Sequence, residues 1–223
     1  MNSVNKTARI AGFFYLLLLP LGILGILYVP TTLVVNGDSV ATARNILAHE
    51  SLYRLSIVSA LLIPIVNIFV VLFLFKLLKP VNNNVAALMV IFILLGAPIA
   101  MLNEVNSVAV LLLLQSADLY GLMALFLDMH EVGIQIAGLF WGLWLFPMGC
   151  LVFKSNYIPK FIGILLMIGC FGYLFDSFMF LLFPDLGVTV SQFTFIGELV
   201  LPLWLVTKGV DVDRWEKRVQ ALA

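Results

Sequence analysis

Five acidic side chains lie inside long apolar stretches of this sequence, together with a histidine, an arginine and two asparagines: Glu104, Asp128, Glu131, Asp176, Glu198, His130, Arg54, Asn67 and Asn103. A charged side chain at the centre of a bilayer costs about 2.5–3.5 kcal/mol on insertion scales, so residues of this kind indicate function when they occur in membrane segments. The carboxyl groups outnumber the basic groups. This excess favours either a positively charged partner that the protein binds or translocates, which is a small cation, a proton or an amine-type ligand, or carboxyl groups that burial keeps neutral.

A second chemistry open to the same residues is hydrolysis of a lipid or peptide inside the membrane. His130 with Asp176 and Glu198 could hold a zinc ion that activates a water molecule. The sequence has no H-E-x-x-H motif, no cysteine ligand set and no G-x-S-x-G motif to support this hypothesis. We therefore expect no resident metal and no cofactor, and an enzyme is the alternative reading. A third reading is a structural or accessory membrane protein whose polar groups only hold helices together.

The amino-acid composition indicates the class of protein to which these residues belong. Hydrophobic residues make up 63% of the 223 and charged residues 11%, with a mean hydropathy of +1.13. Soluble globular chains have about 45–50% apolar and about 25% charged residues. The formal net charge is zero, which gives no attraction for nucleic acid. The expected partner is the lipid bilayer, with a possible small cation or small-molecule ligand. The oligomeric state is not predicted.

Six apolar stretches are long enough to cross a bilayer, which takes about 20 residues. They cover residues 8–29, 52–75, 85–114, 119–153, 161–183 and 188–206. The first lacks a small-residue cleavage site and five more follow it, so we read it as a retained helix rather than a signal peptide. The predicted fold is all-α, a single domain over residues 1–223 that forms an integral membrane bundle of six transmembrane helices.

Basic residues predict how this bundle is oriented, because they are retained in the cytoplasm. Only Arg44 and Arg54 fall on the side opposite to the termini. The other ten lie on the side of the termini: Lys6, Arg9, Lys76, Lys79, Lys154, Lys160, Lys208, Arg214, Lys217 and Arg218. Both termini are therefore expected in the cytoplasm, with residues 209–223 as a cytoplasmic tail. Residues 30–51 form an extracytoplasmic loop, in which Asp38 or Ser39 can cap a short helix.

The depths of the polar residues predict a cavity. Counted at about 1.5 Å per residue from the cytoplasmic end of each helix, Asn67 and Glu198 lie about 12 Å deep and Asp176 about 23 Å. Glu104 lies about 28 Å and Glu131 about 33 Å from the same side. The inner third of the membrane holds almost no ionisable group. We expect an outward-open acidic cavity that is closed near Glu198 and Asn67.

Several motifs resemble one known family, including Leu127 to His130, Gly142-Leu143-Trp144, Ile158-Pro159-Lys160, Gly172 to Ser177 and Phe195 to Leu199. The family is an uncharacterised group of bacterial multi-pass membrane proteins, domain of unknown function 4386. The resemblance extends nearly end to end, from Arg9-Ile10-Ala11-Gly12 to Lys208-Gly209. It implies a protein of the bacterial inner membrane, and it supplies no activity and no catalytic residue.

Overall fold

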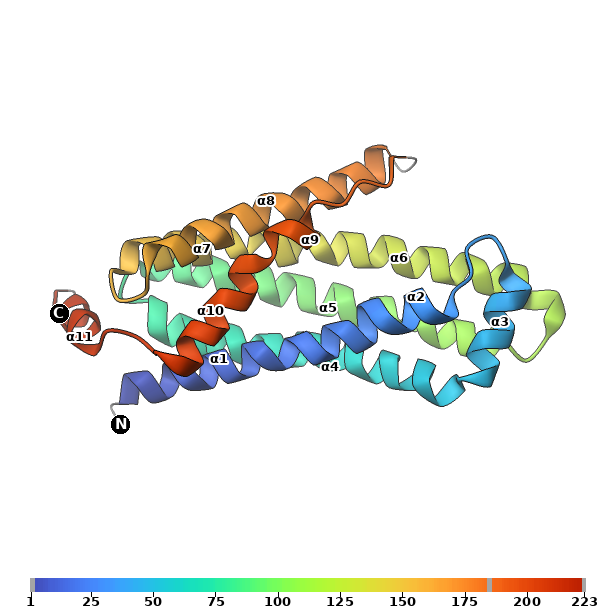
Figure 1. The fold of residues 1–223 in the computed structure, drawn as a ribbon, viewed down its shortest axis with the longest axis horizontal. Helices are drawn as coiled ribbons and strands as arrows, with labels where there is room; N and C mark the ends of the chain where they lie inside the picture. Colours follow the sequence, from blue (N-terminus) through green and yellow to red (C-terminus); the bar gives the residue numbers. More distant parts are fainter. Residues whose placement is uncertain (1–2, 184–185, 222–223) are drawn as a thin grey trace.

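A computed structural model of the chain describes residues 3–183 and 186–221, and within these ranges it contains helices and no strand. The all-helical class predicted from the sequence is therefore confirmed for the described residues. Long helices lie side by side along the longest axis of the molecule (Figure 1). The described elements are α1 Ser3–Gly22, the π-helix η1 Ile23–Tyr28, α2 Val29–Leu33, α3 Ser39–Ala48, α4 Glu50–Leu78, α5 Asn83–Leu113, the 3-10 helix η2 Ala117–Leu119, α6 Tyr120–Leu143, α7 Leu145–Ser155, α8 Lys160–Leu182, α9 Ser191–Thr194, α10 Ile196–Thr207 and α11 Val212–Gln220.

Polar side chains begin several of these helices. Asp38 accepts a hydrogen bond of 2.8 Å from the backbone N–H of Ala41 and so caps α3, as the sequence predicted. Asn82 accepts one of 3.0 Å from Val85 at the start of α5. Asp211 does the same for Arg214 in α11 at 3.1 Å. Helix boundaries are therefore encoded locally, by side chains that satisfy the first free N–H groups.

Among the described residues, five helical stretches are long and apolar enough to cross a membrane. They are Ser3–Leu33, Glu50–Leu78, Asn83–Leu113, Ala117–Ser155 and Lys160–Leu182. A sixth candidate, Ser191–Thr207, qualifies only together with α11, and the two meet at a bend of 97°. The chain is thus a multi-pass membrane protein with five or six spans.

The sixth span differs most from its prediction. Residues 188–206 were expected to form one full helix, but the regular helix α10 has only 12 residues. At 1.5 Å per residue this is about 18 Å, short of the ~30 Å hydrocarbon core. The chain returns from the end of α8 as an extended segment before α9 and α10 begin (Figure 1). Only part of this span is therefore helical.

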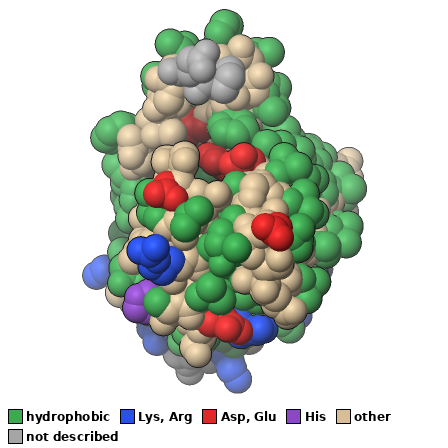
Figure 2. Space-filling model, turned by 90° about the vertical axis from the view of Figure 1, so that its right-hand side faces the viewer, with side chains coloured by type: hydrophobic (Ala, Val, Ile, Leu, Met, Phe, Trp, Pro, Cys, Tyr) green, Lys and Arg blue, Asp and Glu red, His purple; other side chains and the backbone are tan. Residues whose placement is uncertain are grey.

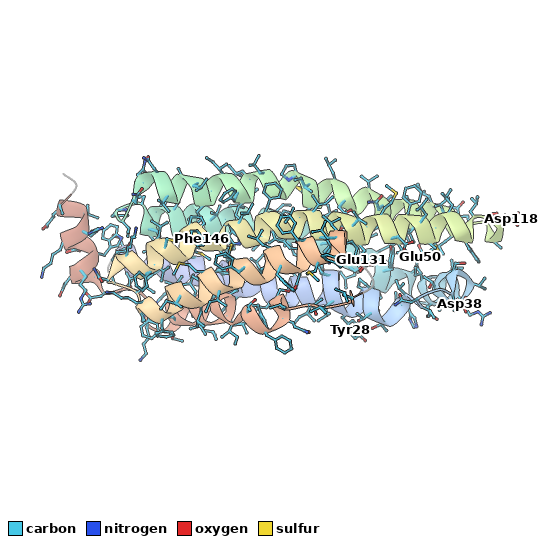
Figure 3. The ribbon with its side chains drawn as sticks, turned by 90° about the horizontal axis from the view of Figure 1, so that it is seen from above. Tyr28, Asp38, Glu50, Asp118, Glu131 and Phe146 are labelled. Atoms are coloured by element: carbon cyan, nitrogen blue, oxygen red, sulfur yellow. The ribbon has the colours of Figure 1, made fainter. Side chains whose placement is uncertain are left out.

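The two ends of the molecule are built differently. The described termini lie at the same end (Figure 1), which we call the terminal end, and the end that carries α3 is the far end. Asp38, Glu50 and Asp118 lie at the far end, and Glu131 lies closer to the middle (Figure 3). The ten basic residues that the sequence grouped lie on helices and turns of the terminal end.

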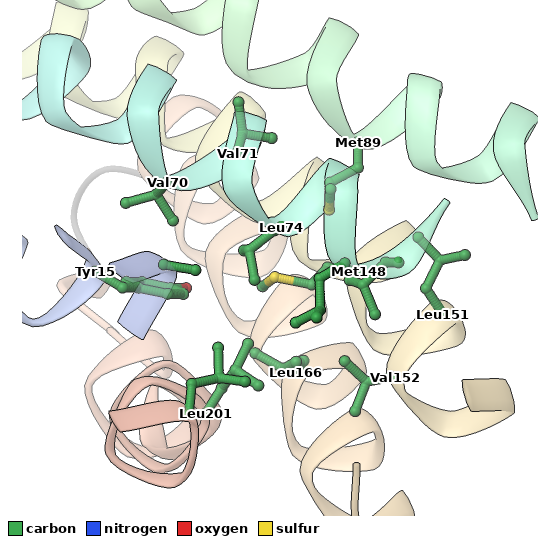
Figure 4. Close-up of a cluster of buried hydrophobic side chains, with 14 of the residues drawn as sticks. Tyr15, Val70, Val71, Leu74, Met89, Met148, Leu151, Val152, Leu166 and Leu201 are labelled. Carbon is green, nitrogen blue, oxygen red and sulfur yellow. The ribbon is translucent and has the colours of Figure 1, made fainter. Parts of the chain in front are cut away.

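A dense apolar core fills the half of the bundle next to the terminal end. Six helices contribute to it, through Tyr15 of α1, Leu74 of α4, Met89 of α5, Met148 of α7, Leu166 of α8 and Leu201 of α10 (Figure 4). A smaller cluster around Ile46, Tyr53 and Met123 closes the far end beneath α3. Between lipid-facing helices, association depends on close packing because lipid is as apolar as the side chains. The terminal half is therefore the rigid base on which the polar residues above it are placed.

Candidate functional site

A cavity of about 750 Å³ lies between α1 with η1, α4, α6, α8 and the short helices α9 and α10. The non-helical residues Gly187, Val188 and Thr189, which precede α9, form part of its wall. Most of its wall is apolar, and its polar side chains come from every surrounding helix and from the chain before α9: Tyr15, Asn67, Glu131, Gln135, Tyr173, Asp176, Ser177, Thr189, Ser191 and Glu198. Pockets for small molecules usually combine such a wall with a few polar groups.

Glu198, in the first turn of α10, lines this cavity. The hydroxyl of Tyr15 in α1 donates a hydrogen bond of 3.2 Å to its Oε2 atom. The Tyr173 side chain of α8 approaches the same carboxyl group. The other oxygen, Oε1, is buried and has no hydrogen-bond partner among the described residues. Tyr15 and Tyr173 thus hold this carboxyl group in place, and its Oε1 atom retains the capacity to accept a further donor.

Asn67, in the middle of α4, lines the same cavity. Its side chain is buried, and its Oδ1 atom also has no hydrogen-bond partner within the described part of the chain. Leaving a buried acceptor unpaired costs about 1–3 kcal/mol. Two such acceptors, from Asn67 and Glu198, therefore line one cavity and mark it as a place where a hydrogen-bond donor would be stabilised.

Asp176 of α8 has a different role. Its Oδ1 accepts a hydrogen bond of 2.6 Å from the backbone N–H of Val190, and its Oδ2 accepts one of 2.9 Å from Ser191. Val190 directly precedes α9 and Ser191 is its first residue, so these are N–H groups that the helix itself leaves without a partner. Bare backbone at membrane depth is tolerated only where protein groups satisfy it. Asp176 thus holds the broken sixth span in place, and both of its oxygens are occupied.

Glu131 and Gln135 of α6 lie toward the far-end side of the cavity, and Glu131 is exposed. Figure 2 views the far end of the molecule and shows acidic side chains gathered in the hollow between the end of α8 and the rest of the bundle. Phe183 and Val188, which follow α8, also line the cavity and are about half exposed. The cavity therefore opens toward the far end and toward the lipid-facing side of α8.

A second polar cluster lies outside the cavity, between α5 and α6. Glu104 Oε1 and His130 Nε2 share a hydrogen bond of 3.0 Å, and their side chains are 5% and 17% exposed. Asn103 Nδ2 donates to the backbone oxygen of His130 at 2.9 Å. Asn106 in turn donates to Asn103 Oδ1 at 3.0 Å. These residues satisfy one another, so the cluster pins α5 to α6 and leaves no free acceptor on Glu104 comparable to that of Glu198.

The remaining two predicted site residues lie at the surface. Arg54 donates a hydrogen bond of 2.7 Å to Glu50 one turn earlier in α4, and both side chains are exposed. Asp128 is exposed on α6 and does not line the cavity. Of the nine predicted residues, the structure therefore brings together four, Asn67, Glu131, Asp176 and Glu198, in one cavity.

Sequence reasoning missed the aromatic residues of the cavity. Tyr15 and Tyr173 contact Glu198, and Trp141 and Trp144 form part of the wall. A tyrosine in the middle of a membrane span carries a hydroxyl that must find a partner, and this was the available signal. Among the described residues, no group of three or more His, Cys, Asp or Glu side chains could hold a metal ion.

The π-helix η1 borders the cavity and is a further departure from regular structure. Here the chain of α1 widens by one residue per turn over Ile23–Tyr28, and Ile23, Ile26 and Leu27 face the cavity. Gly25 lies on the opposite side, where a Cβ atom would come within 2.9 Å of the backbone of Ala60 in α4. Such single-turn π segments are frequent at functional sites.

Comparison with known proteins identifies the family. The family model described as "Domain of unknown function (DUF4386)" matches residues 10–209. An uncharacterized protein of Archaeoglobus fulgidus is 33% identical over 156 residues, which cover 69% of this chain and 83% of that protein. No solved structure matches the chain. This relative is archaeal, so a bacterial inner membrane stays a prediction. As the sequence motifs predicted, the chain belongs to the family of domain of unknown function 4386.

Proposed function

We propose that this membrane protein binds an amine-type ligand, a cationic ammonium group with an apolar body, in the cavity above Glu198. The observation that supports this proposal is the pair of buried, unpartnered acceptors, Glu198 Oε1 and Asn67 Oδ1, in one largely apolar cavity. An ammonium group has three donors and a positive charge, and would satisfy both oxygens. Hydrogen bonds to a charged group contribute about 1.5–3 kcal/mol each.

The shape of the cavity favours an organic amine over a bare metal ion. Its volume of about 750 Å³ falls within the ~300–1,000 Å³ that small-molecule pockets occupy. Apolar residues such as Ile63, Trp141 and Phe180 form most of the wall, and they would cover an alkyl or aromatic body. A small inorganic cation would leave this wall without a partner.

The basic residues support a position of the ligand on the extracytoplasmic side of the membrane. Ten of the twelve lie at the terminal end, which favours a cytoplasmic position for both termini and for α11. The cavity opens away from that end, and α3 covers the outer surface. Trp144, Leu145 and Met148 are buried in the apolar core that fills the terminal half of the bundle. Transport of the ligand would require this core to open.

The proposal is tested by binding three ligands with the same chain and different head groups. Purified protein in phosphatidylcholine nanodiscs is titrated at neutral pH with octylamine, octanol and octanoate, and tryptophan fluorescence is recorded. We expect octylamine, which is cationic, to bind about ten- to hundredfold more tightly than octanol, because only the cation makes charge-assisted hydrogen bonds. Octanoate should not bind. Equal affinities for octylamine and octanol would contradict the proposal.

Two variants show whether the fluorescence signal comes from the cavity. Trp141 lines the cavity, whereas Trp215 lies in α11 at the terminal end. Trp141→Phe should remove a large part of the octylamine-dependent change, and Trp215→Phe should leave that change in place. The reverse result would mean that octylamine binds elsewhere. Empty nanodiscs in the same titration give the contribution of partitioning into lipid.

A further inference from the structure

We propose that a second hollow, at the terminal end, binds the phosphate headgroup of an anionic phospholipid. It has a volume of about 440 Å³ and lies between the turn that joins α7 to α8 and the linker that joins α10 to α11. The cavity above Glu198 lies in a different part of the bundle and shares no lining residue with this hollow. The inference therefore does not depend on the proposed amine ligand.

The walls of this hollow are fixed to each other. The backbone N–H of Asp211 donates a hydrogen bond of 3.1 Å to the backbone oxygen of Tyr157. Arg214 Nη1 donates one of 2.9 Å to the backbone oxygen of Asn156. The hydroxyl of Tyr157 is buried and donates at 2.8 Å to the backbone oxygen of Leu77. A preformed hollow of this kind binds a ligand with little ordering of the protein.

Positive charge dominates the rim. Lys160 begins α8, Lys208 follows α10 and Arg214 lies in α11, so three separate segments each contribute one cation. The one acidic lining residue, Asp211, is already engaged by Arg214 Nε at 3.1 Å. Within the described part of the chain, neither Lys160 nor Lys208 forms an ion pair, and Lys160 Nζ lies 5.6 Å from the centre of the Phe153 ring. The two ammonium groups are thus available to an anion.

The surroundings favour a lipid over a free anion. Trp204 of α10 lines the hollow, and tryptophan is enriched at the level of lipid headgroups. From the hollow toward the middle of the bundle, Phe161 and Ile164 of α8 and Leu203 of α10 expose apolar side chains to the bilayer. These side chains would contact acyl chains while the headgroup lies among the lysines. Basic pockets between helices on the cytoplasmic side are typical sites for anionic headgroups.

The test measures lipid binding to delipidated protein in detergent by native mass spectrometry. Dioleoyl phosphatidylglycerol is the anionic probe and dioleoyl phosphatidylcholine the zwitterionic reference. We expect wild type to bind one phosphatidylglycerol in preference to phosphatidylcholine. Lys160→Gln with Lys208→Gln should weaken phosphatidylglycerol binding about 25-fold, because each basic residue near an anionic surface contributes roughly a fivefold factor.

The matched control changes two lysines of the same end that do not line the hollow, Lys154→Gln with Lys217→Gln. It should bind phosphatidylglycerol as wild type does, and an equal loss in both double variants would overturn the proposal. Inorganic phosphate is added as a competitor, and complete displacement of the lipid by it would instead assign the hollow to a free anion. If the Lys160 and Lys208 double variant does not elute as a folded protein on gel filtration, Lys208→Gln alone should show about a fivefold loss.

Discussion

Glu104 and Glu198 both lie inside the bundle, but the regions around them are built in opposite ways. At the interface of α5 and α6, Glu104 meets His130 at 3.0 Å, and neighbouring amides complete the cluster. In the cavity, Glu198 receives a hydroxyl on one oxygen and leaves the other without a partner among the described residues. In the first region the polar groups satisfy one another and form a structural contact between helices. In the second region an acceptor remains without a partner among the described residues, and the proposed amine site rests on this difference.

The same contrast separates the two halves of the bundle. Near the terminal end, α7 and α8 approach so closely that a Cβ atom on Gly163 would lie 2.6 Å from the backbone oxygen of Gly149. Beside the cavity, a Cβ atom on Gly22 would meet nothing within 4 Å. The difference follows from the sixth span, whose short α10 fills the terminal half and leaves the rest open. An interrupted helix is thus a direct way to build a cavity inside a membrane bundle.

The largest expected effect tests whether the contact of Glu104 is structural. His130→Ala leaves Glu104 buried without its partner and should lower the free energy of unfolding by about 3–5 kcal/mol. Unfolding is measured by titrating the protein in mixed micelles with sodium dodecyl sulfate. Adding Glu104→Ala to His130→Ala should restore part of the loss, since no unpaired carboxyl group then remains. If the losses of unfolding free energy from the two substitutions were additive, they would contradict a structural contact, because the two residues would not interact.

The close approach of α7 and α8 gives the next largest effect. Gly163→Ala places a methyl group against backbone atoms of Gly149 and Phe153, which cannot move without separating the helices. Overpacking of this kind should cost about 1–3 kcal/mol in the same unfolding titration. A variant as stable as wild type would show that the terminal half is looser than its contacts indicate.

Asp176 lines the cavity, yet its contacts are structural, so it tests whether the two kinds of region can be told apart by their hydrogen bonds. Asp176→Ala removes the acceptor from two backbone N–H groups, those of Val190 and Ser191. The loss should be about 2 kcal/mol, given that each buried donor without a partner costs about 1–3 kcal/mol and water can reach part of the cavity. Asp128→Ala, at an exposed position of the neighbouring helix α6, is the control and should leave stability unchanged. Equal stability of the two variants would remove the structural role from Asp176.

The smallest expected effect is an increase in the free energy of unfolding. Gly22→Ala adds a methyl group to a helical position that faces open space in the cavity. Replacing a helical glycine by alanine without strain stabilises by about 0.4–1 kcal/mol, mainly through the unfolded chain. The unfolding midpoint should therefore rise, in contrast to the fall expected for Gly163→Ala. A fall for both variants would mean that no open space adjoins Gly22.

Most of the fold could be predicted from the sequence, since the apolar lengths gave the first five spans and local caps such as Asp38 and Asn82 marked helix starts. The break in the sixth span could not. Polar and apolar residues alternate in part from Val188 to Phe195, but neither Gly nor Pro occurs there to mark where a helix would end. The break depends on Asp176, which satisfies the freed N–H groups from another helix. That contact is tertiary and leaves no periodic signal.

The candidate site was predictable only in part, because tertiary packing also determines which residues face the cavity. Depth along each helix placed Asn67 and Glu198 at the closed end of the expected cavity and Asp176 farther toward its mouth, because rise per residue is fixed. Depth does not give the rotation of one helix against its neighbours. Glu104 and Glu131 were therefore expected in one cavity, whereas Glu104 faces His130 between α5 and α6. The rotation is determined by packing, such as the space at Gly133 that the Asn103 side chain occupies.

The most direct test compares octylamine binding to two variants that each remove one buried carboxylate. Glu198→Gln and Glu104→Gln keep the size of the side chain, and glutamine can still hydrogen-bond to Tyr15 or to His130. We expect Glu198→Gln to weaken octylamine binding about ten- to hundredfold, the loss of a charge-assisted hydrogen bond, and Glu104→Gln to leave it unchanged. Wild-type affinity in Glu198→Gln, or an equal loss in both variants, would contradict the assignment of the cavity as an amine site.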